Sequence, residues 1–328
     1  MAIVFATNDI SDFVGAGIST DSTDRRTAYV SQAFITSANS VGQAGLIAFT
    51  RIPTVAGNIT WIHFQYAKSR DFTGGGSDGF AVLELFSGSG VKILDFDMSN
   101  GVIRLRLFGS STLTANITGN MIGQNAPMAV DIKIDLTSDI SVEMFVNGVS
   151  KYNQSQAWSS SPGNPAGIYW RIADASDFGA ILQYTSELIV ADESTIGMGL
   201  SKMVPNAAGN YSQWQGDHAA TGDSDVGTGV STDAISQKLS SGLSSIIGPA
   251  SSALRALVVN TKASTRGGTV NDLRTFLRIS STDYNGAAMG VDGDIKSHIT
   301  VWDTNPDSAA DWDTTDFSGV EVGVESLT

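Results

Sequence analysis

Residues 91–108 read VKILDFDMSNGVIRLRLF, which is two alternating runs joined by an Asn-Gly pair. In the first run a period of two places Lys92 and Phe96 on one face and Asp95 on the other. In the second run Ile and Leu alternate with Arg. Such a period predicts half-buried strands. The Asn-Gly pair predicts a tight hairpin because both residues tolerate positive φ.

The same pattern recurs along roughly the first 195 residues. Further runs of alternating, β-branched and aromatic residues occur at 60–67, 80–86, 129–136, 141–146, 149–152, 167–172 and 179–190. Asn147-Gly148 predicts another hairpin between two of these runs. Roughly a dozen short strands at this spacing are typical of a β-sandwich or jelly roll. The expected fold class is therefore all-β, with two β-sandwich (jelly-roll-like) domains in tandem.

The composition is consistent with an all-β protein of two domains. The chain has 328 residues, which is more than one ordinary domain usually holds. Charged residues make up 16%, too few for long helices with a wet face rich in Glu and Lys, and 35 glycines suit many turns. The strand rhythm breaks at 197–205, so we expect domains at 1–196 and 203–328. Residues 236–247 (SQKLSSGLSSII) fit a short helix or a long loop.

The net charge of −14 and the absence of cysteine exclude several classes of protein. An acidic surface repels phosphate backbones and anionic membranes, so we expect neither nucleic-acid binding nor membrane insertion. A chain without cysteine has no disulfide and no thiolate metal site, which fits folding in a reducing host cytoplasm. Residues 1–6 lack the basic region of a signal peptide, so we expect none.

Aromatic side chains outside the predicted core are candidates for a sugar-binding platform, because rings bind the apolar face of a pyranose by burying area. Trp158 lies in a loop rich in Ser, Gly and Pro, and Tyr152 and Tyr169 lie in predicted strands. These three are the candidate ligand-binding residues. Trp61 and Trp170 also lie within strands, and we expect them to pack in the core.

Asp217, Asp223 and Asp225 are candidate calcium ligands, since carboxylates at odd spacing in a Gly-rich loop supply oxygens that calcium binds. The order of an EF-hand is absent, so the alternative is a loop that holds no cofactor. Asp95 and Asp131 are expected on solvated strand faces. Alternating acids of this kind also occur in glycoside hydrolases on lectin-like sandwiches.

No catalytic constellation emerges from the sequence. The three histidines, His63, His218 and His298, form no recognisable Ser-His-Asp set, and no Gly-x-Ser-x-Gly elbow occurs in a strand–turn–helix context. His63 lies inside a strand and is expected to be structural. An acid with no partner to tune its pKa is a poor catalyst. We therefore expect a protein that is not an enzyme.

Two stretches in the first 195 residues resemble a known family. Residues 141–149 (SVEMFVNGV) resemble the Val-Asn-Gly hairpin of laminin-G-like and concanavalin-like lectin domains. Residues 187–192 (ELIVAD) resemble the closing strand of those domains. The resemblance covers about residues 1–195 and implies a lectin-like sandwich.

The C-terminal third resembles a β-rich module of phage and prophage virion proteins. Residues 205–214 (PNAAGNYSQW), 277–284 (LRISSTDY) and 301–306 (VWDTNP) follow the order of that module. Its pattern pairs an early Gly-x-x-x-x-Trp with Arg-x-Gly/Ser-x-Thr-Asp-Tyr and a late Trp-x-Thr-Asn/Asp-Pro. One departure is that the acidic loop 222–225 continues as VGTG and lacks the frequent Thr-Tyr of the family. The resemblance implies a virion role.

These features predict a bacteriophage virion structural protein, tail- or fibre-associated, whose N-terminal sandwich binds host-surface glycan. Its expected partners are other virion proteins and further copies of itself. A trimer is favoured because closed symmetry multiplies weak contacts into avidity. Two alternatives stay open. One is a capsid decoration or cement protein that binds only the assembled lattice, and the other is a polysaccharide-degrading enzyme of lectin-like fold.

Overall fold

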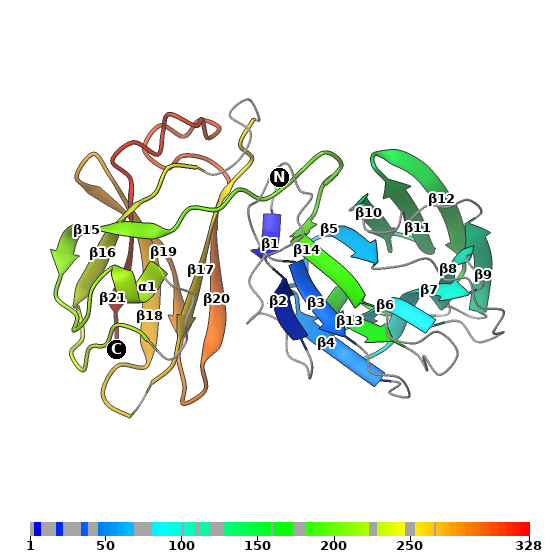
Figure 1. The fold of residues 1–328 in the computed structure, drawn as a ribbon, viewed down its shortest axis with the longest axis horizontal. Coiled ribbons are helices and arrows are strands. Elements are labelled where there is room, and N and C mark those ends of the chain that lie inside the picture. Colours follow the sequence, from blue (N-terminus) through cyan, green and yellow to red (C-terminus); the bar gives the residue numbers. More distant parts are fainter. Residues whose placement is uncertain are drawn as a thin grey trace. The chain divides into compact units, whose positions relative to one another are not determined.

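The computed structural model describes most of the chain as β-strands (Figure 1). The described residues are 3–7, 18–21, 34–38, 45–68, 80–99, 102–108, 112–117, 128–158, 160–172, 182–222, 228–246, 253–265 and 267–328. Within them the secondary structure is almost entirely antiparallel strands, and the one helix there, α1 (Ala219–Gly222), has four residues. The all-β prediction is confirmed.

The chain divides into two compact units, which are described separately. Unit 1 comprises Met1–Leu200 and unit 2 comprises Ser201–Thr328. The division falls inside the segment 197–205, where the strand rhythm of the sequence breaks. In the described part of both units, no helix is long and apolar enough to span a membrane.

Unit 1 contains an eight-stranded and a six-stranded antiparallel sheet. The larger sheet has the order β12-β11-β10-β5-β14-β3-β2, with β1 also paired to β14. Its strands are β1 (Ile3–Thr7), β2 (Ile18–Asp21), β3 (Phe34–Ala38), β5 (Ile59–Lys68), β10 (Met128–Asp135), β11 (Ile140–Val146), β12 (Val149–Gln156) and β14 (Leu182–Ala191). The smaller sheet has the order β4-β13-β6-β7-β8-β9. Its strands are β4 (Gly45–Arg51), β6 (Phe80–Ser87), β7 (Lys92–Ser99), β8 (Val102–Phe108), β9 (Thr112–Ile117) and β13 (Pro165–Ile172).

The core of unit 1 lies between these two sheets. Ile62 of β5 pairs with Ile132 of β10, and both are fully buried. Phe64, two residues along β5, meets Trp170 of β13 edge to face at 5.1 Å, which joins the inner faces of the sheets. Because side chains alternate along a strand, the neighbours of Trp170 in sequence point to the opposite, outer face of the six-stranded sheet.

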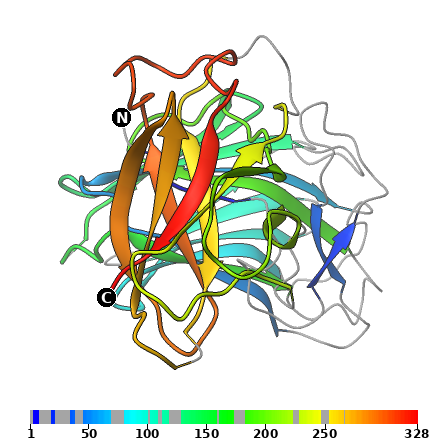
Figure 2. The same ribbon diagram turned by 90° about the vertical axis from the view of Figure 1, so that its left-hand side faces the viewer.

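Unit 2 packs a two-stranded sheet against a five-stranded one (Figure 2). The larger sheet has the order β15-β16-β21-β18-β19, with β21 drawn in red. Its strands are β15 (Pro205–Ser212), β16 (Lys238–Leu243), β18 (Asp272–Ile279), β19 (Thr282–Gly290) and β21 (Glu321–Ser326). The smaller sheet pairs β17 (Leu257–Ala263) with β20 (Lys296–Trp302). The core between them contains Leu257, Leu277, Ile279, Trp302, Trp312 and Val320.

Two local predictions have clear outcomes. Asn147 and Gly148 have φ values of 49° and 75°, so the predicted hairpin between β11 and β12 is confirmed. The prediction of a helix or a loop at 236–247 is wrong for its first half, because Lys238–Leu243 forms β16. Pairing with β15 on one side and β21 on the other supplies backbone partners that the local sequence does not reveal.

Candidate functional site

The outer face of the six-stranded sheet in unit 1 carries a group of charged and aromatic side chains on four adjacent strands, β13, β6, β7 and β8 (Figure 1). We call this group the outer-face cluster. Its members are Tyr169 on β13, Glu84 and Phe86 on β6, Lys92 and Asp95 on β7, and Arg106 and Phe108 on β8. The cluster faces away from the core, because the neighbouring Leu83, Leu85, Ile168 and Trp170 are buried on the other side.

Strand register places one polar row of the cluster across the strands. Tyr169 pairs with Glu84, Glu84 pairs with Asp95, and Asp95 pairs with Arg106. Paired residues in antiparallel strands share a face, with Cβ atoms about 4.5–5.5 Å apart. These four side chains therefore form a line perpendicular to the strands.

A β-bulge in β7 brings Lys92 to the same face. Leu85 pairs with Leu94 and Phe86 pairs with Lys92, so Ile93 is an extra residue with no partner on β6. One extra residue reverses the side to which the preceding side chain points. Sequence alternation therefore places Lys92 on the face opposite Asp95, and this prediction is wrong because a bulge separates the two.

The four charges of the cluster are bonded to one another. Lys92 Nζ lies 2.5 Å from Glu84 Oε1 and 3.5 Å from Asp95 Oδ2. Arg106 Nε donates to Asp95 Oδ1 at 2.6 Å. The two cations balance the two carboxylates, so the site carries no net charge when all four are ionised.

Asp95 is buried although it belongs to an outer face. Its exposed fraction is 0%, because the side chains of Lys92 and Arg106 lie over it. The prediction of a solvated Asp95 is wrong, since alternation reports the face of a strand but not what neighbouring side chains cover. Burial of a carboxylate is tolerated here because two cations compensate it.

The aromatic members lie beside the charges. The rings of Phe86 and Tyr169 meet edge to face at 4.7 Å. Lys92 Nζ lies 5.7 Å from the centre of the Phe86 ring and 5.1 Å from that of Phe108, within the range of cation–π attraction. Phe86, Phe108 and Tyr169 are each half-buried. The arrangement offers rings together with fixed hydrogen-bonding groups.

A second polar cluster lies on the outer face of the eight-stranded sheet, where His63 of β5 pairs with Asp131 of β10. His63 Nδ1 and Asp131 Oδ1 are 2.8 Å apart, and both residues are fully buried. The structural role expected for His63 is confirmed. The solvated face expected for Asp131 is wrong, because Asp131 is fully buried and is bonded to both His63 and Thr195.

Residues 195–200 are held by two hydrogen bonds to buried side chains. Thr195 Oγ1 donates to Asp131 Oδ1 at 2.7 Å, and the backbone of Leu200 hydrogen-bonds Glu187. A Cβ at Gly199 would lie 3.2 Å from Glu187 Oε2. Burial raises the pKa of Glu187, an effect that the nearby His63 partly opposes. The segment that ends unit 1 is thus held on buried polar groups.

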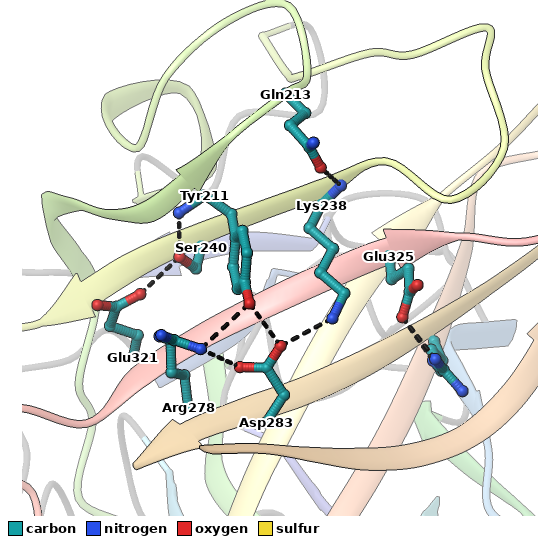
Figure 3. A network of polar contacts seen from close by, with 9 residues as sticks. Tyr211, Gln213, Lys238, Ser240, Arg278, Asp283, Glu321 and Glu325 are labelled. Carbon is teal, nitrogen blue, oxygen red and sulfur yellow. Dashed lines mark hydrogen bonds and ion pairs between the residues drawn. The ribbon is translucent and has the colours of Figure 1, made fainter. Parts of the chain in front are cut away.

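Unit 2 carries a third polar network on the five-stranded sheet (Figure 3). Tyr211 Oη donates to Asp283 Oδ2 at 2.9 Å and accepts from Arg278 Nη1 at 3.1 Å. Lys238 Nζ lies 2.7 Å from the same Asp283 oxygen, and Arg278 Nη1 lies 2.6 Å from Oδ1. Ser240 donates to Glu321 on one side of this centre, and Arg274 pairs with Glu325 on the other.

The network joins strands that are not neighbours in the sheet. Tyr211 lies on the edge strand β15 and Asp283 lies on the opposite edge strand β19. A register shift between Ala208 and Ser212 lets β15 depart from regular pairing before Tyr211. The Tyr211 ring meets buried Phe276 at 5.8 Å, and around it three basic side chains form ion pairs with two carboxylates, Asp283 and Glu325. We interpret this network as a clamp on the sheet.

The predicted ligand-binding residues do not share one face. Tyr152 pairs with buried Met144, is 6% exposed and points into the core, where burial raises its pKa to about 12. Tyr169 is half-buried within the outer-face cluster, and Trp158 is half-buried after β12. Trp61 and Trp170 are buried, as expected for core residues. Only Tyr169 of the three candidates joins the cluster.

The candidate calcium ligands remain a prediction. Asp217 is exposed and its Oδ1 accepts a hydrogen bond from the backbone of Ala219 at 3.0 Å. Asp223 and Asp225 lie outside the described residues. Among the residues that the structure describes, no group of three His, Cys, Asp or Glu side chains is placed to hold a metal ion.

Sequence reasoning missed five members of the cluster: Glu84, Phe86, Lys92, Arg106 and Phe108. One signal for the set was present. Asn100 and Gly101 lie outside the described residues, but the two-residue turn that they predict would pair Ser99 with Val102, and counting back along both strands then pairs Asp95 with Arg106, as observed. The bulge that adds Lys92 has no comparable signal in the local pattern.

Comparison with known proteins gives remote similarities of structure. No family model matches the chain, and no curated protein matches it. An endo-β-1,4-glucuronan lyase from the fungus Trichoderma reesei is 10% identical, with a TM-score of 0.43, over 60% of this chain and 98% of its own. The cellulose-induced protein Cip1 is 12% identical, with a TM-score of 0.43, over 58% and 97%.

The binding domain of Paraclostridial Mosquitocidal Protein 1 is 10% identical, with a TM-score of 0.43, over 58% of this chain and 49% of that one. Each of these TM-scores is below 0.5, so no activity of this chain follows from them. What the chain does has to be inferred from its own side chains.

Proposed function

We propose that this chain is a non-enzymatic carbohydrate-binding protein of a bacteriophage particle and that the outer-face cluster is its glycan site. The observation that carries the proposal is the combination of half-buried rings with two partly exposed cations, Lys92 and Arg106, that ion pairs hold in place on the same sheet face. A pyranose has an apolar C–H face and a rim of hydroxyls. Rings bury the first, and charged groups form strong hydrogen bonds with the second.

The ion pairs favour binding over catalysis. Glycoside hydrolysis needs one carboxylic acid that donates a proton and one carboxylate that acts as base or nucleophile. Glu84 accepts from Lys92, and Asp95 accepts from Arg106 and lies 3.5 Å from the Lys92 ammonium, so both carboxylates face cations and neither is arranged as a donor. The polysaccharide-degrading alternative therefore has less support at this face.

The buried His63–Asp131 pair also suits a structural role. In a catalytic triad the carboxylate orients the imidazole and the imidazole activates a hydroxyl. Here the nearby hydroxyl, Thr195 Oγ1, is bonded to Asp131 instead. All three residues are fully buried, so a substrate has no access to them in this conformation.

The virion part of the proposal rests on residues 203–328, whose motifs resemble phage structural modules. Several of those motif residues form the clamp, since Tyr211, Arg278 and Asp283 bond one another. The hydrogen bonds and ion pairs of the clamp hold the sheet of unit 2 together without disulfides. Such a module can assemble onto a particle in the reducing host cytoplasm. Other virion proteins are the proposed partners, and a trimer would multiply weak glycan contacts into avidity.

Two measurements test the proposal. A glycan array probed with the wild-type chain and with Tyr169→Ala is expected to show binding that the substitution weakens, and an array without any signal would sink the glycan site. A stained gel of purified virions tests the location. Tens of copies per particle fit a fibre, hundreds fit the decoration protein instead, and absence from the particle contradicts the virion role.

A further inference from the structure

We infer that the ligand of the outer-face cluster is an uncharged, hydroxyl-rich oligosaccharide that lies across the strands, in preference to a monosaccharide or a polyanionic chain. This inference rests on the proposed function and specifies its ligand. It is drawn from two features of the cluster: the direction of its rows and the way its charges cancel.

The cluster consists of two parallel rows. The polar row contains Tyr169, Glu84, Asp95 and Arg106, which pair successively across β13, β6, β7 and β8. The aromatic row contains Phe86 and Phe108, with the Lys92 ammonium between their rings. Both rows run perpendicular to the strands. A ligand with a continuous apolar side and a continuous hydroxyl side would contact the half-buried members of both rows when it lies in the same direction.

The length of the rows sets the length of the ligand. Tyr169 lies on β13 and Phe108 lies on β8, which is three strands away in the sheet order. With strands about 4.8 Å apart, this separation is roughly 14 Å. A single pyranose ring cannot reach both ends. Full occupation of the rows therefore requires a chain of several sugars.

The charges of the cluster determine what kind of chain fits. Each cation already bonds a carboxylate inside the cluster: Lys92 bonds Glu84 and Asp95, and Arg106 bonds Asp95. An anionic sugar would have to draw one cation away and leave a buried carboxylate without its partner. Breaking a buried pair in this way is costly. Hydroxyl groups can instead contact the partly exposed side chains of Lys92 and Arg106 without separating either pair.

A uronate-binding site is the principal rival, since Lys and Arg beside Tyr would suit a carboxylated chain. The burial of the partners argues against it. Glu84 is 5% exposed and Asp95 is 0% exposed, whereas Lys92 and Arg106 lie over them. Each cation is therefore already neutralised by a buried carboxylate beneath it. Its exposed side offers an anionic ligand little uncompensated positive charge.

The test is an array that holds neutral, uronic, sulfated and sialylated glycans at lengths from one to about six sugars. It is probed with the wild-type chain, with Tyr169→Ala and Phe108→Ala, and with the matched control Phe145→Ala. Phe145 is a half-buried aromatic residue on the other sheet, where it stacks on Trp61. The bound glycans are then titrated at low and at high salt.

The expected result is that the glycans bound through the cluster are neutral and contain three or more sugars. Tyr169→Ala and Phe108→Ala should each weaken them roughly tenfold, Phe145→Ala should not, and salt should have little effect because no ligand charge is screened.

Cluster-dependent binding of uronic or sulfated chains that falls with salt would overturn the inference and leave the proposed function intact. So would monosaccharides bound as tightly as longer chains. Binding that neither substitution weakens places the ligand elsewhere, and no binding at all overturns the proposed function itself.

Discussion

Lys92 and Asp95 lie on the same face of β7, with Nζ 3.5 Å from Oδ2, although they are three positions apart in the sequence. In a regular strand they would face opposite sides of the sheet. The extra residue Ile93 cancels one step of the alternation. It thereby converts a line of three polar residues into a compact charged cluster between two aromatic rings. The following predictions test this cluster and the other polar groups on which the fold depends.

Lys92→Met should destabilise unit 1, because it removes the cation between two buried carboxylates and keeps much of the side-chain volume. We expect the free energy of unfolding in urea to fall by about 1–3 kcal/mol, the cost of leaving buried polar groups unsatisfied. Lys151→Met on β12 is the control, since Lys151 is exposed. It should change stability by less than about 0.5 kcal/mol. Equal effects of the two substitutions would show that the bridge contributes nothing.

Asp131→Ala should release the segment that ends unit 1. The substitution leaves His63 Nδ1 and Thr195 Oγ1 without their shared acceptor, at a cost of about 1–3 kcal/mol. Hydrogen exchange is expected to accelerate at residues 195–200 more than in the sheets. Asp139→Ala, at an exposed turn position, serves as the control. Unchanged exchange at residues 195–200 would mean that other contacts hold the segment.

Glu187 should make stability fall as the pH rises. Burial raises its pKa in the folded chain above the 4.5 of an unfolded one. The folded state therefore keeps this proton while the unfolded state loses it, and the contribution is fully present below 4.5 and lost as the pH rises through the folded pKa. Glu187→Gln should gain stability over the wild type as the pH rises above 4.5, as measured by urea unfolding. A difference that does not vary with pH would contradict this.

Asp283 should act in the opposite direction in unit 2. Burial raises its pKa, but hydrogen bonds from Lys238, Arg278 and Tyr211 outweigh that effect and hold it below the 3.8 of an unfolded chain. Its contribution is present above 3.8 and is lost as the pH falls through the lower folded pKa. Asp283→Asn should therefore be less stable than the wild type near neutral pH and approach it in strong acid. Thermal unfolding across that range measures the convergence, and a constant gap would refute it.

Gly323→Ala should disrupt the five-stranded sheet of unit 2. A Cβ at this position of β21 would collide with the Phe276 ring and lie 2.6 Å from the carbonyl oxygen of Leu239. Overpacking of this kind typically costs about 1–3 kcal/mol. Gly293→Ala is the matched control, because a Cβ there meets no atom within 4 Å. The two melting temperatures should differ clearly, and similar values would indicate that the sheet relaxes around the added methyl group.

The sequence by itself predicted the all-β class, many of the strands and the hairpin between β11 and β12, but it did not predict β1–β4, β9 or β16. Alternation at 91–108 and at 141–146 reports side-chain burial along a single strand, and Asn147-Gly148 reports a turn that needs positive φ. These signals are local, so they do not depend on how strands pair. They were sufficient for the all-β class and for the hairpin that aligns Asp95 with Arg106.

Only the tertiary structure decided which polar residues meet. The bulge at Ile93 arises from pairing with β6, buried Asp131 accepts a hydrogen bond from Thr195, which is more than sixty residues away, and Tyr211 reaches Asp283 only because β15 leaves its register. Each depends on contacts between residues distant in sequence. The alternation along a strand reflects which side chains are polar and which are apolar. The tertiary fold determines which oppositely charged partner lies beside a buried charge and compensates its burial.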